Sequence, residues 1–345
     1  MPTVNAKQWR PDAAASDGLS SQSLSPHIVL SFDVEEHYRI EAASQLEISP
    51  SQKAHYAERL EPSTRWLLDQ LFRFNVRATF FVVGEIARHN PALIRAIHDS
   101  GHEVASHGWD HQRVLAMTPA AFRRDIRQSK EALEDVIGEP VRGYRAPTFS
   151  VVRQTAWALD VLAEEELAYD SSIYPVRHDR YGVPAAPRVP FRAHGERHSI
   201  LELPPATLRL FGVNTPMGGG GYFRLFPLFL TRWALRQARR SGSPAVATLY
   251  FHPWEFDPDQ ERLPLGRLSR LRTYVGITRS QGRLVSLLQR YPFARAIDVA
   301  KELDGVWTSL PRFHVASGIA MEPASTTPEL ATCAITASTE ASHAR

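Results

Sequence analysis

The amino-acid sequence predicts an α/β fold built on a mostly parallel sheet. Strand-like and helix-like segments alternate along the chain, and about seven strands separated by helices are typical of such a sheet. Strands are expected at 27–35, 77–84, 102–106, 141–146, 168–171, 200–203, 245–251 and 294–299. The sheet is either a closed barrel or an open doubly wound sheet. No G-x-G-x-x-G follows the first strand, which weighs against dinucleotide binding.

Helix boundaries between these strands are marked by capping residues. Asn90 precedes Pro91, Thr118 precedes Pro119, and Gly138 follows the second of these helices. Asn or Thr before Pro predicts a helix start, and Gly predicts its end. Further helices are expected at 62–74, 154–166 and 226–240. Gly218–Gly221 precedes Tyr222 without a strand leading into it, so we expect a mobile loop at the rim of the sheet.

The length of 345 residues suits one large domain or two small ones. The folded region is expected at 26–312, with an extension from about 258, a disordered leader at 1–25 and a disordered tail at 313–345. The formal net charge is +3, and the excess arginines are expected to be spread over a mixed-charge surface, which argues against nucleic-acid binding. Neither a secretory segment nor a long apolar run is present. A cytoplasmic location is therefore expected, with a peripheral position at the inner membrane face as the alternative.

The cysteine count limits the kinds of site that the chain can form. Cys333 is the single cysteine, so a disulfide within the chain and a thiolate-rich zinc site are both excluded. A bound metal would need histidine and carboxylate ligands.

The first strand places two carboxylates on one face. Ile28, Leu30, Phe32 and Val34 alternate with Val29, Ser31, Asp33 and Glu35. Because strand side chains alternate, Asp33 and Glu35 share a face at the strand end. Two neighbouring carboxylates repel each other unless a cation or a proton lies between them. The alternative is that both carboxylates lie at a solvent-exposed strand end and have no function. The apolar residues that precede them indicate a buried strand and weigh against this alternative.

Other predicted strands also end in polar residues. His107 and His111 follow the third strand, and their spacing lets both imidazoles face one point if the chain turns helically. Arg145 follows the fourth strand, where it could orient a carboxylate. Asp170 ends the fifth, and His252 follows the strand at 245–251. Alone, each of these residues is more often structural, but together they predict a site at the carboxyl ends of the strands.

These segments occur in the order of a known set of motifs. Phe32-Asp33-Val34-Glu35, Ser106-His107-x-x-x-His111, Arg145-Ala146-Pro147, Tyr169-Asp170-Ser171 and Leu249-x-x-His252 resemble the motifs of the polysaccharide deacetylases of carbohydrate esterase family 4, the NodB-homology family. The resemblance covers about His27 to Asp257. Segments at 143–147, 177–182, 218–224 and 252–255 look like a subfamily associated with exopolysaccharide loci and the exosortase (PEP-CTERM) sorting system.

The resemblance implies a distorted (β/α)7-type barrel and one divalent ion, with Zn2+ as first choice and Co2+, Ni2+ or Mn2+ as alternatives. Family members hold the ion with an Asp-His-His triad, which corresponds here to Glu35, His107 and His111. Many members have a second aspartate where this chain has Val34. Glu35 is expected to take over the ligand role because it shares the face of Asp33, and Glu36 is a weaker candidate.

The resemblance also implies roles in the removal of acetyl groups from an N-acetylated polysaccharide or a lipid-linked glycan precursor. Asp33 would be the base and His252 the acid. Arg145 would hold Asp33, Asp170 would orient His252 or Arg145, and the N–H of Thr148 would stabilise the oxyanion. Trp109, Tyr222, Phe223 and Trp254 are candidates for stacking on sugar rings, although two or more could equally be core residues.

Two other functions are compatible with the same pattern. Allantoinase-like and cyclic-imide hydrolases share the fold and cleave other amides, so a substrate panel would separate them from a deacetylase. A carbohydrate-binding pseudoenzyme without turnover is the second alternative. The glycan and the oligomeric state are not fixed by the sequence.

Overall fold

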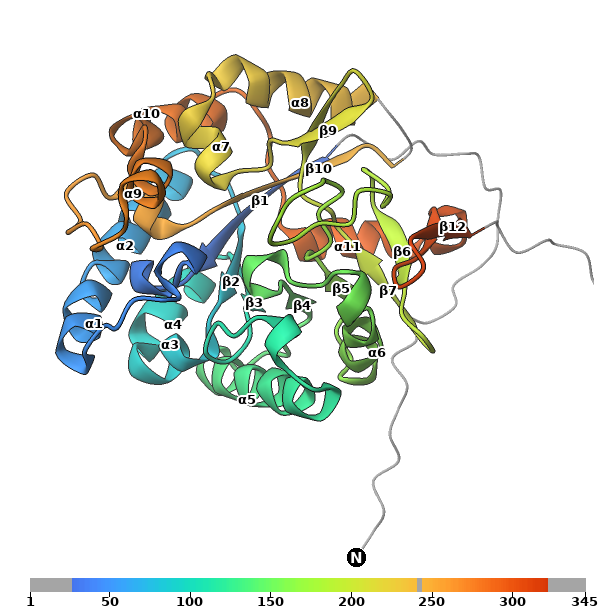
Figure 1. Cartoon of the computed structure of the whole chain (residues 1–345), viewed down its shortest axis with the longest axis horizontal. Helices are drawn as coiled ribbons and strands as arrows, with labels where there is room; N and C mark the ends of the chain where they lie inside the picture. The colour runs from blue at the N-terminus through green and yellow to red at the C-terminus, as the bar shows by residue number, and fades with distance from the viewer. Residues whose placement is uncertain (1–26, 241–243, 322–345) are drawn as a thin grey trace, which may run out of the picture.

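The computed structural model describes residues 27–240 and 244–321, so the predicted leader at 1–25 and the tail beyond Met321 lie outside the described residues. A ten-stranded sheet has the order β10-β1-β2-β3-β4-β5-β7-β6-β11-β12, and β8 and β9 form a separate hairpin (Figure 1). The strands are β1 His27–Val34, β2 Thr79–Val82, β3 Glu103–Ser106, β4 Gly143–Tyr144, β5 Tyr169–Asp170, β6 Phe191–His194, β7 Ser199–Glu202, β8 Thr207–Leu210, β9 Val213–Pro216, β10 Val246–Phe251, β11 Arg312–His314 and β12 Ile319–Met321.

Seven of these strands close into a distorted barrel. The neighbours from β10 through β1 to β5 and β7 all pair in parallel. Just after β7, Pro205 forms a parallel bridge with Thr248 of β10, and Ala206 N–H donates to Thr248 O at 2.9 Å. The predicted (β/α)7-type barrel is therefore present, with a single bridge at its seam.

Helices surround the barrel and connect its strands (Figure 1). Their bounds are α1 Pro50–Ala57, α2 Leu60–Arg73, α3 Gly84–His89, α4 Pro91–Asp99, α5 Pro119–Ile137, α6 Trp157–Glu164, α7 Gly220–Leu225, α8 Leu228–Arg240, α9 Arg267–Tyr274, α10 Ile277–Leu288 and α11 Ala296–Asp304. The capping signals act as expected, because Asn90 accepts from Leu93 N–H at 3.1 Å and Thr118 from Ala121 N–H at 3.2 Å. In the part of the chain that is described, no helix combines the length and apolarity needed to cross a bilayer.

The alternation of β1 separates two apolar clusters. Ile28, Leu30, Phe32 and Val34 pack outward against the helices. Val29 faces the barrel interior, where it packs with Phe81 and with residues of α11. Helix α11 lies at the amino-terminal end of the barrel, where Ala296 N–H donates to Thr79 Oγ1 at 2.7 Å and Ile297 N–H to Glu103 Oε2 at 2.9 Å.

Three expectations about individual segments are wrong. The predicted strand at 294–299 is mostly α11, since Ala296, Val299, Ala300 and Leu303 recur at helical spacing and form its buried face. Only Ala294 bridges to β1, at Val29. Gly218–Gly221 is not a simple loop, because Gly219 bridges to Tyr250 and α7 begins at Gly220.

The third correction concerns the end of the domain. We expected a disordered tail from residue 313, yet β11 pairs in parallel with β6, and β12 pairs with β11 through Ile319 and Met321. Phe313 is buried against Phe191, with ring centroids 5.8 Å apart. The folded region thus continues to Met321.

Candidate active site

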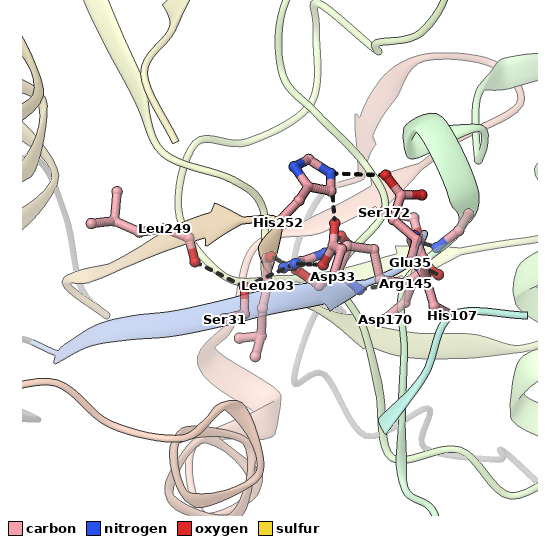
Figure 2. A network of polar contacts seen from close by, with 12 residues as sticks. Ser31, Asp33, Glu35, His107, Arg145, Asp170, Ser172, Leu203, Leu249 and His252 are labelled. Carbon is pink, nitrogen blue, oxygen red and sulfur yellow. Dashed lines mark hydrogen bonds and ion pairs between the residues drawn. The ribbon is translucent and has the colours of Figure 1, made fainter. Parts of the chain in front are cut away.

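Side chains from several barrel strands meet at the carboxyl end of β1 (Figure 2). Asp33 comes from β1, and Glu35, His107, Arg145 and His252 follow β1, β3, β4 and β10 directly. Each side chain is on the side of its strand that faces the barrel interior. Residues far apart in the sequence therefore meet at the carboxyl ends of the strands, as predicted.

Arg145 holds Asp33 in place. Its Nη1 donates to Asp33 Oδ1 at 2.6 Å and to Ser31 Oγ at 2.8 Å. Its Nε donates to Ser171 O at 3.1 Å and its Nη2 to Ser171 Oγ at 2.8 Å. The guanidinium also lies 4.1 Å from the centroid of Phe81, and it is fully buried. This network fixes the orientation of Asp33 and leaves Oδ2 free of the guanidinium.

Glu35, His107 and His111 form a cluster that could hold a metal ion. One ligand atom from each lies within 4.8 Å of the others, and Glu35 Oε2 contacts His111 Nε2. The Nδ1–H of His107 donates to Arg145 O at 2.8 Å, so its Nε2 carries the free lone pair. Glu36 does not join the cluster, because Arg39 Nε binds it at 2.5 Å.

The ionisation of the cluster suits a cation. Burial lowers the pKa of His107 to about 4, although the nearby carboxylate of Asp33 acts in the opposite direction. The lowered pKa keeps the imidazole neutral. Burial alone would raise the pKa of Glu35, but the neighbouring His111, followed by His252 and His107, lowers it below its usual range. One anionic carboxylate, one neutral imidazole with a fixed lone pair and a second imidazole are a ligand set that Zn2+ accepts, so these residues fit a divalent ion.

The approach of the two histidines differs from the helical turn that we expected. Gly108 has φ +75° and His111 has φ +66°, so the chain reverses through two left-handed residues. A non-glycine residue in this region is uncommon and is found at functional sites. The reversal brings the ring centroids of His107 and His111 to 5.1 Å.

His252 is held by a pair of charged residues that the sequence did not lead us to expect. Its Nδ1–H donates to Glu255 Oε1 at 2.6 Å, and Arg224 Nε donates to Glu255 Oε2 at 2.7 Å. The His252 Nε2 then faces Glu35 Oε1 at 3.6 Å and Asp33 Oδ2 at 3.9 Å. Burial opposes protonation, but the hydrogen bond to Glu255 and the nearby carboxylates raise the pKa of His252 to about 9.

A local signal for Glu255 was present in the sequence. Pro253 follows His252, and Glu255 lies three residues after it, the spacing of a capping box. In the structure, the 3₁₀ turn Pro253–Phe256 brings the carboxylate back to both the backbone N–H and the ring of His252. The resemblance includes this segment but implies no role for Glu255.

Asp170 lies elsewhere than expected. Its neighbours Tyr169 and Ser171 face the barrel interior, so Asp170 points to the outer face and does not contact His252. It binds Ser171 N–H at 2.9 Å and the hydroxyl of Ser172, and Ser172 Oγ in turn accepts from Ala146 N–H at 2.7 Å. Asp170 therefore supports the backbone beside Arg145 and does not orient His252.

A cavity of about 180 Å3 opens over these residues. Thr148 and Trp254 line it, as expected for substrate-binding residues, and Tyr181 and Tyr250 add further aromatic wall. The other three aromatic candidates do not line it. Phe223 is buried against Phe251, Trp109 packs beside Gly84 under Arg88, and Tyr222 stacks on Phe226.

Two family models match the chain. Residues 52–164 match the model described as polysaccharide deacetylase, and residues 171–301 match a domain of unknown function (DUF3473). His107, His111 and Arg145 fall in the first segment and His252 in the second. Asp33 and Glu35 precede both segments, so the two models together cover only part of the site.

Known proteins similar to this chain share the fold or part of the sequence. The peptidoglycan-N-acetylglucosamine deacetylase PgdA of Listeria monocytogenes is 36% identical over 93 residues, which span 27% of this chain and 20% of that protein. The structure of a probable polysaccharide deacetylase from Pseudomonas aeruginosa PAO1 is 18% identical with a TM-score of 0.56, covering 81% of this chain and 91% of that one. PuuE allantoinase is 16% identical with a TM-score of 0.50, covering 85% and 98%. The family model that matches residues 52–164 and this sequence relative thus agree on a resemblance to polysaccharide deacetylases.

Proposed function

We propose that this chain, whose residues 52–164 match the polysaccharide deacetylase family, hydrolyses the N-acetyl groups of a glycan and releases acetate. The observation that carries the proposal is the presence in one cavity of an arginine-bound aspartate, a possible metal cluster and a carboxylate-bound histidine. These are the groups that amide hydrolysis by an activated water requires.

Glu35, His107 and His111 would hold the divalent ion, for which zinc is our first choice. When bound, the ion would polarise the amide carbonyl and lower the pKa of a water molecule. The fixed Nδ1–H of His107 presents its other nitrogen to the cluster, and this pre-orientation lowers the cost of forming the site.

Asp33 would accept the proton of the attacking water. Arg145 occupies Oδ1, so Oδ2 is the oxygen that faces the cavity and His252. The buried guanidinium keeps the carboxylate in one orientation, and a general base must be positioned before its basicity matters.

His252 would protonate the departing amine of the sugar. Glu255 holds Nδ1, which leaves the Nε2–H directed towards Asp33 and Glu35. Glu255 and Arg224 act as positioning residues in this scheme, since neither needs to touch the reacting atoms. Thr148, in the left-handed region at φ +56°, lines the cavity beside them, and its backbone N–H is the candidate donor to the oxyanion.

The glycan is proposed to be an exopolysaccharide or its lipid-linked precursor, handled in the cytoplasm or at the inner membrane face. Three segments that resemble the exosortase-associated subfamily support this choice, because each contributes to the cavity wall through Tyr181, Gly220 or Trp254. The wall of the cavity, rather than its floor, is where substrate preference would reside.

Acetate release from N-acetylated chito-oligosaccharides and from acetylated exopolysaccharide precursors tests the proposal. The protein would be stripped with a chelator, reloaded separately with Zn2+, Co2+, Ni2+ or Mn2+, and assayed with allantoin and a cyclic imide in parallel. We expect acetate only from the glycans and only after reloading. Turnover of allantoin instead, or glycan binding without acetate release, would favour the two alternatives.

A further inference from the structure

The arginines of this chain are not evenly spread, contrary to the mixed-charge surface that we expected. From Leu203 to Trp254 the sequence has six arginines and no aspartate, glutamate or lysine, although the whole chain carries a formal net charge of only +3. A block of one charge sign in an otherwise balanced protein points to a charged partner.

Four of these arginines are exposed and have no acidic partner. Arg224 binds Glu255 and Arg232 binds Ser286 Oγ at 2.8 Å. In contrast, Arg209, Arg236, Arg239 and Arg240 lie at the surface and form no ion pair with any residue of 27–240 or 244–321. Their charge is therefore available to a partner.

Helix α8 combines part of this charge with exposed aromatic side chains. Its inner face is buried through Thr231, Ala234, Leu235 and Ala238. Its outer face carries Phe229, which is 61% exposed, and Trp233, which is 44% exposed, followed one turn apart by Arg236 and Arg240. Aromatic residues and arginines on the outer face of a helix are typical of helices that lie at a membrane surface.

The β8–β9 hairpin extends this surface. It lies against α8 (Figure 1), where Leu208 packs with Ala234 and Gln237 Oε1 accepts from Arg209 N–H at 2.8 Å. The tip of the hairpin is Phe211, whose side chain is fully exposed at 104%. Val213, the next strand residue, is 63% exposed.

The conformation of Phe211 makes its position unusual. Phe211 has φ +48° and Gly212 has φ +81°, so the two central residues of the turn are left-handed. Asn, Asp and Gly are the residues that favour this turn, and a bulky aromatic residue there is both strained and without packing. The fold gives no stabilising reason for a phenylalanine at this tip.

We propose that the outer face of α8 and the tip of the β8–β9 hairpin form a docking surface for an anionic lipid bilayer. Phe211, Phe229 and Trp233 would enter the interfacial region, and the four unpaired arginines would contact the acidic headgroups. Charge complementarity favours this partner over a second copy of the chain, because two such faces would repel each other. The inference rests on this surface alone and does not depend on the proposed reaction.

Flotation of the full-length protein with vesicles tests the docking surface. We expect binding to vesicles of phosphatidylcholine with about one third phosphatidylglycerol, weak binding to pure phosphatidylcholine, and a loss of binding at high salt. The double variant Arg236→Gln/Arg240→Gln should weaken binding by about tenfold or more. Phe211→Ala should also weaken binding at low salt, by a factor that depends less on salt concentration than that of the arginine variant, since its contribution is apolar.

Phe72→Ala is the matched control, because Phe72 is 89% exposed on α2 and lies outside this surface. It should bind vesicles as the unchanged protein does, and thermal melts should show that all variants fold. Equal binding to neutral and anionic vesicles would overturn the proposal, as would unchanged binding by the arginine variant. Sedimentation velocity showing a dimer that Phe211→Ala dissociates would assign the surface to self-association instead.

Discussion

His252 Nδ1 and Glu255 Oε1 lie 2.6 Å apart, and this hydrogen bond leaves the opposite ring nitrogen of His252 facing Asp33 and Glu35. Glu255 is itself fully buried and is held by Arg224. Glu255 and Arg224 thus fix the orientation of the proposed acid, although neither needs to touch the reacting atoms.

Replacement of Glu255 by glutamine should reduce kcat more than it changes KM. Glutamine has one carbonyl oxygen, so it cannot accept from both His252 and Arg224 as the carboxylate does. We expect a loss of about tenfold or more in kcat for acetate release, within the range that a general acid contributes. Asp257 lies two residues after Glu255 and forms an ion pair with Arg59. Asp257→Asn, which breaks this ion pair, is the control and should keep kcat. Equal activity of both variants would contradict the role of Glu255.

Asp33→Asn should retain the metal and lose turnover. The amide can still receive a hydrogen bond from Arg145, but it cannot accept a proton from water. Activity should fall by about 100-fold or more, while metal content stays at that of the unchanged protein. Asp69→Asn, an exposed position on α2, controls for the loss of one charge. An Asp33→Asn protein that still turns over would refute the assignment of the base.

His107→Ala should lose the bound ion. The imidazole supplies one of the three proposed ligands, and two ligands hold a divalent ion poorly. Elemental analysis after dialysis should give a metal content well below that of the unchanged protein, whereas His98→Ala, on the outside of α4, should keep it. A stoichiometric metal content in His107→Ala would speak against this ligand set.

Glu202→Gln should change how stability depends on pH. Glu202 and Asp170 are register partners on β7 and β5, and both are buried. Burial and the charge of Asp170 raise the pKa of Glu202 well above its ordinary value, and burial raises the pKa of Asp170 to about 6. We infer that the pair holds a proton in the folded protein.

The sign of the effect follows from these raised values. As pH rises from about 4.5 to 6, the unfolded chain releases protons that the folded chain keeps, so the free energy of unfolding falls by up to about 1.4 kcal/mol per pH unit for each such proton. A glutamine side chain cannot ionise, so urea titrations at pH 5, 6 and 7 should give a flatter profile for the variant. The exposed Glu58→Gln should leave the slope unchanged, and an unchanged slope in Glu202→Gln would disprove the shared proton.

Much of the site could be predicted because its geometry follows from strand parity. The alternation of β1 fixed Asp33 and Glu35 on one face, and polar residues after successive strands indicated where the other side chains would meet. The same rule, applied to Tyr169 and Ser171, would have placed Asp170 on the outer face. A contact between Asp170 and His252, which the resemblance implied, is therefore incompatible with the parity of β5.

The remainder depends on contacts that local sequence does not specify. The pairing of Asp170 with Glu202 requires the register of two strands that are separated by about thirty residues of chain. The reversal at Gly108 and His111 needs two left-handed residues, one of them a histidine that tertiary contacts hold there. The segment at 294–299 has apolar residues compatible with both periods, and its packing across the bottom of the barrel selects the helix.

Anomalous diffraction from crystals soaked in a zinc salt, recorded on both sides of the zinc absorption edge, shows whether Glu35, His107 and His111 bind one ion. We expect one strong peak bounded by Glu35, His107 and His111, with Asp33 and His252 beside it. A strong peak elsewhere with none among these three residues would contradict this expectation.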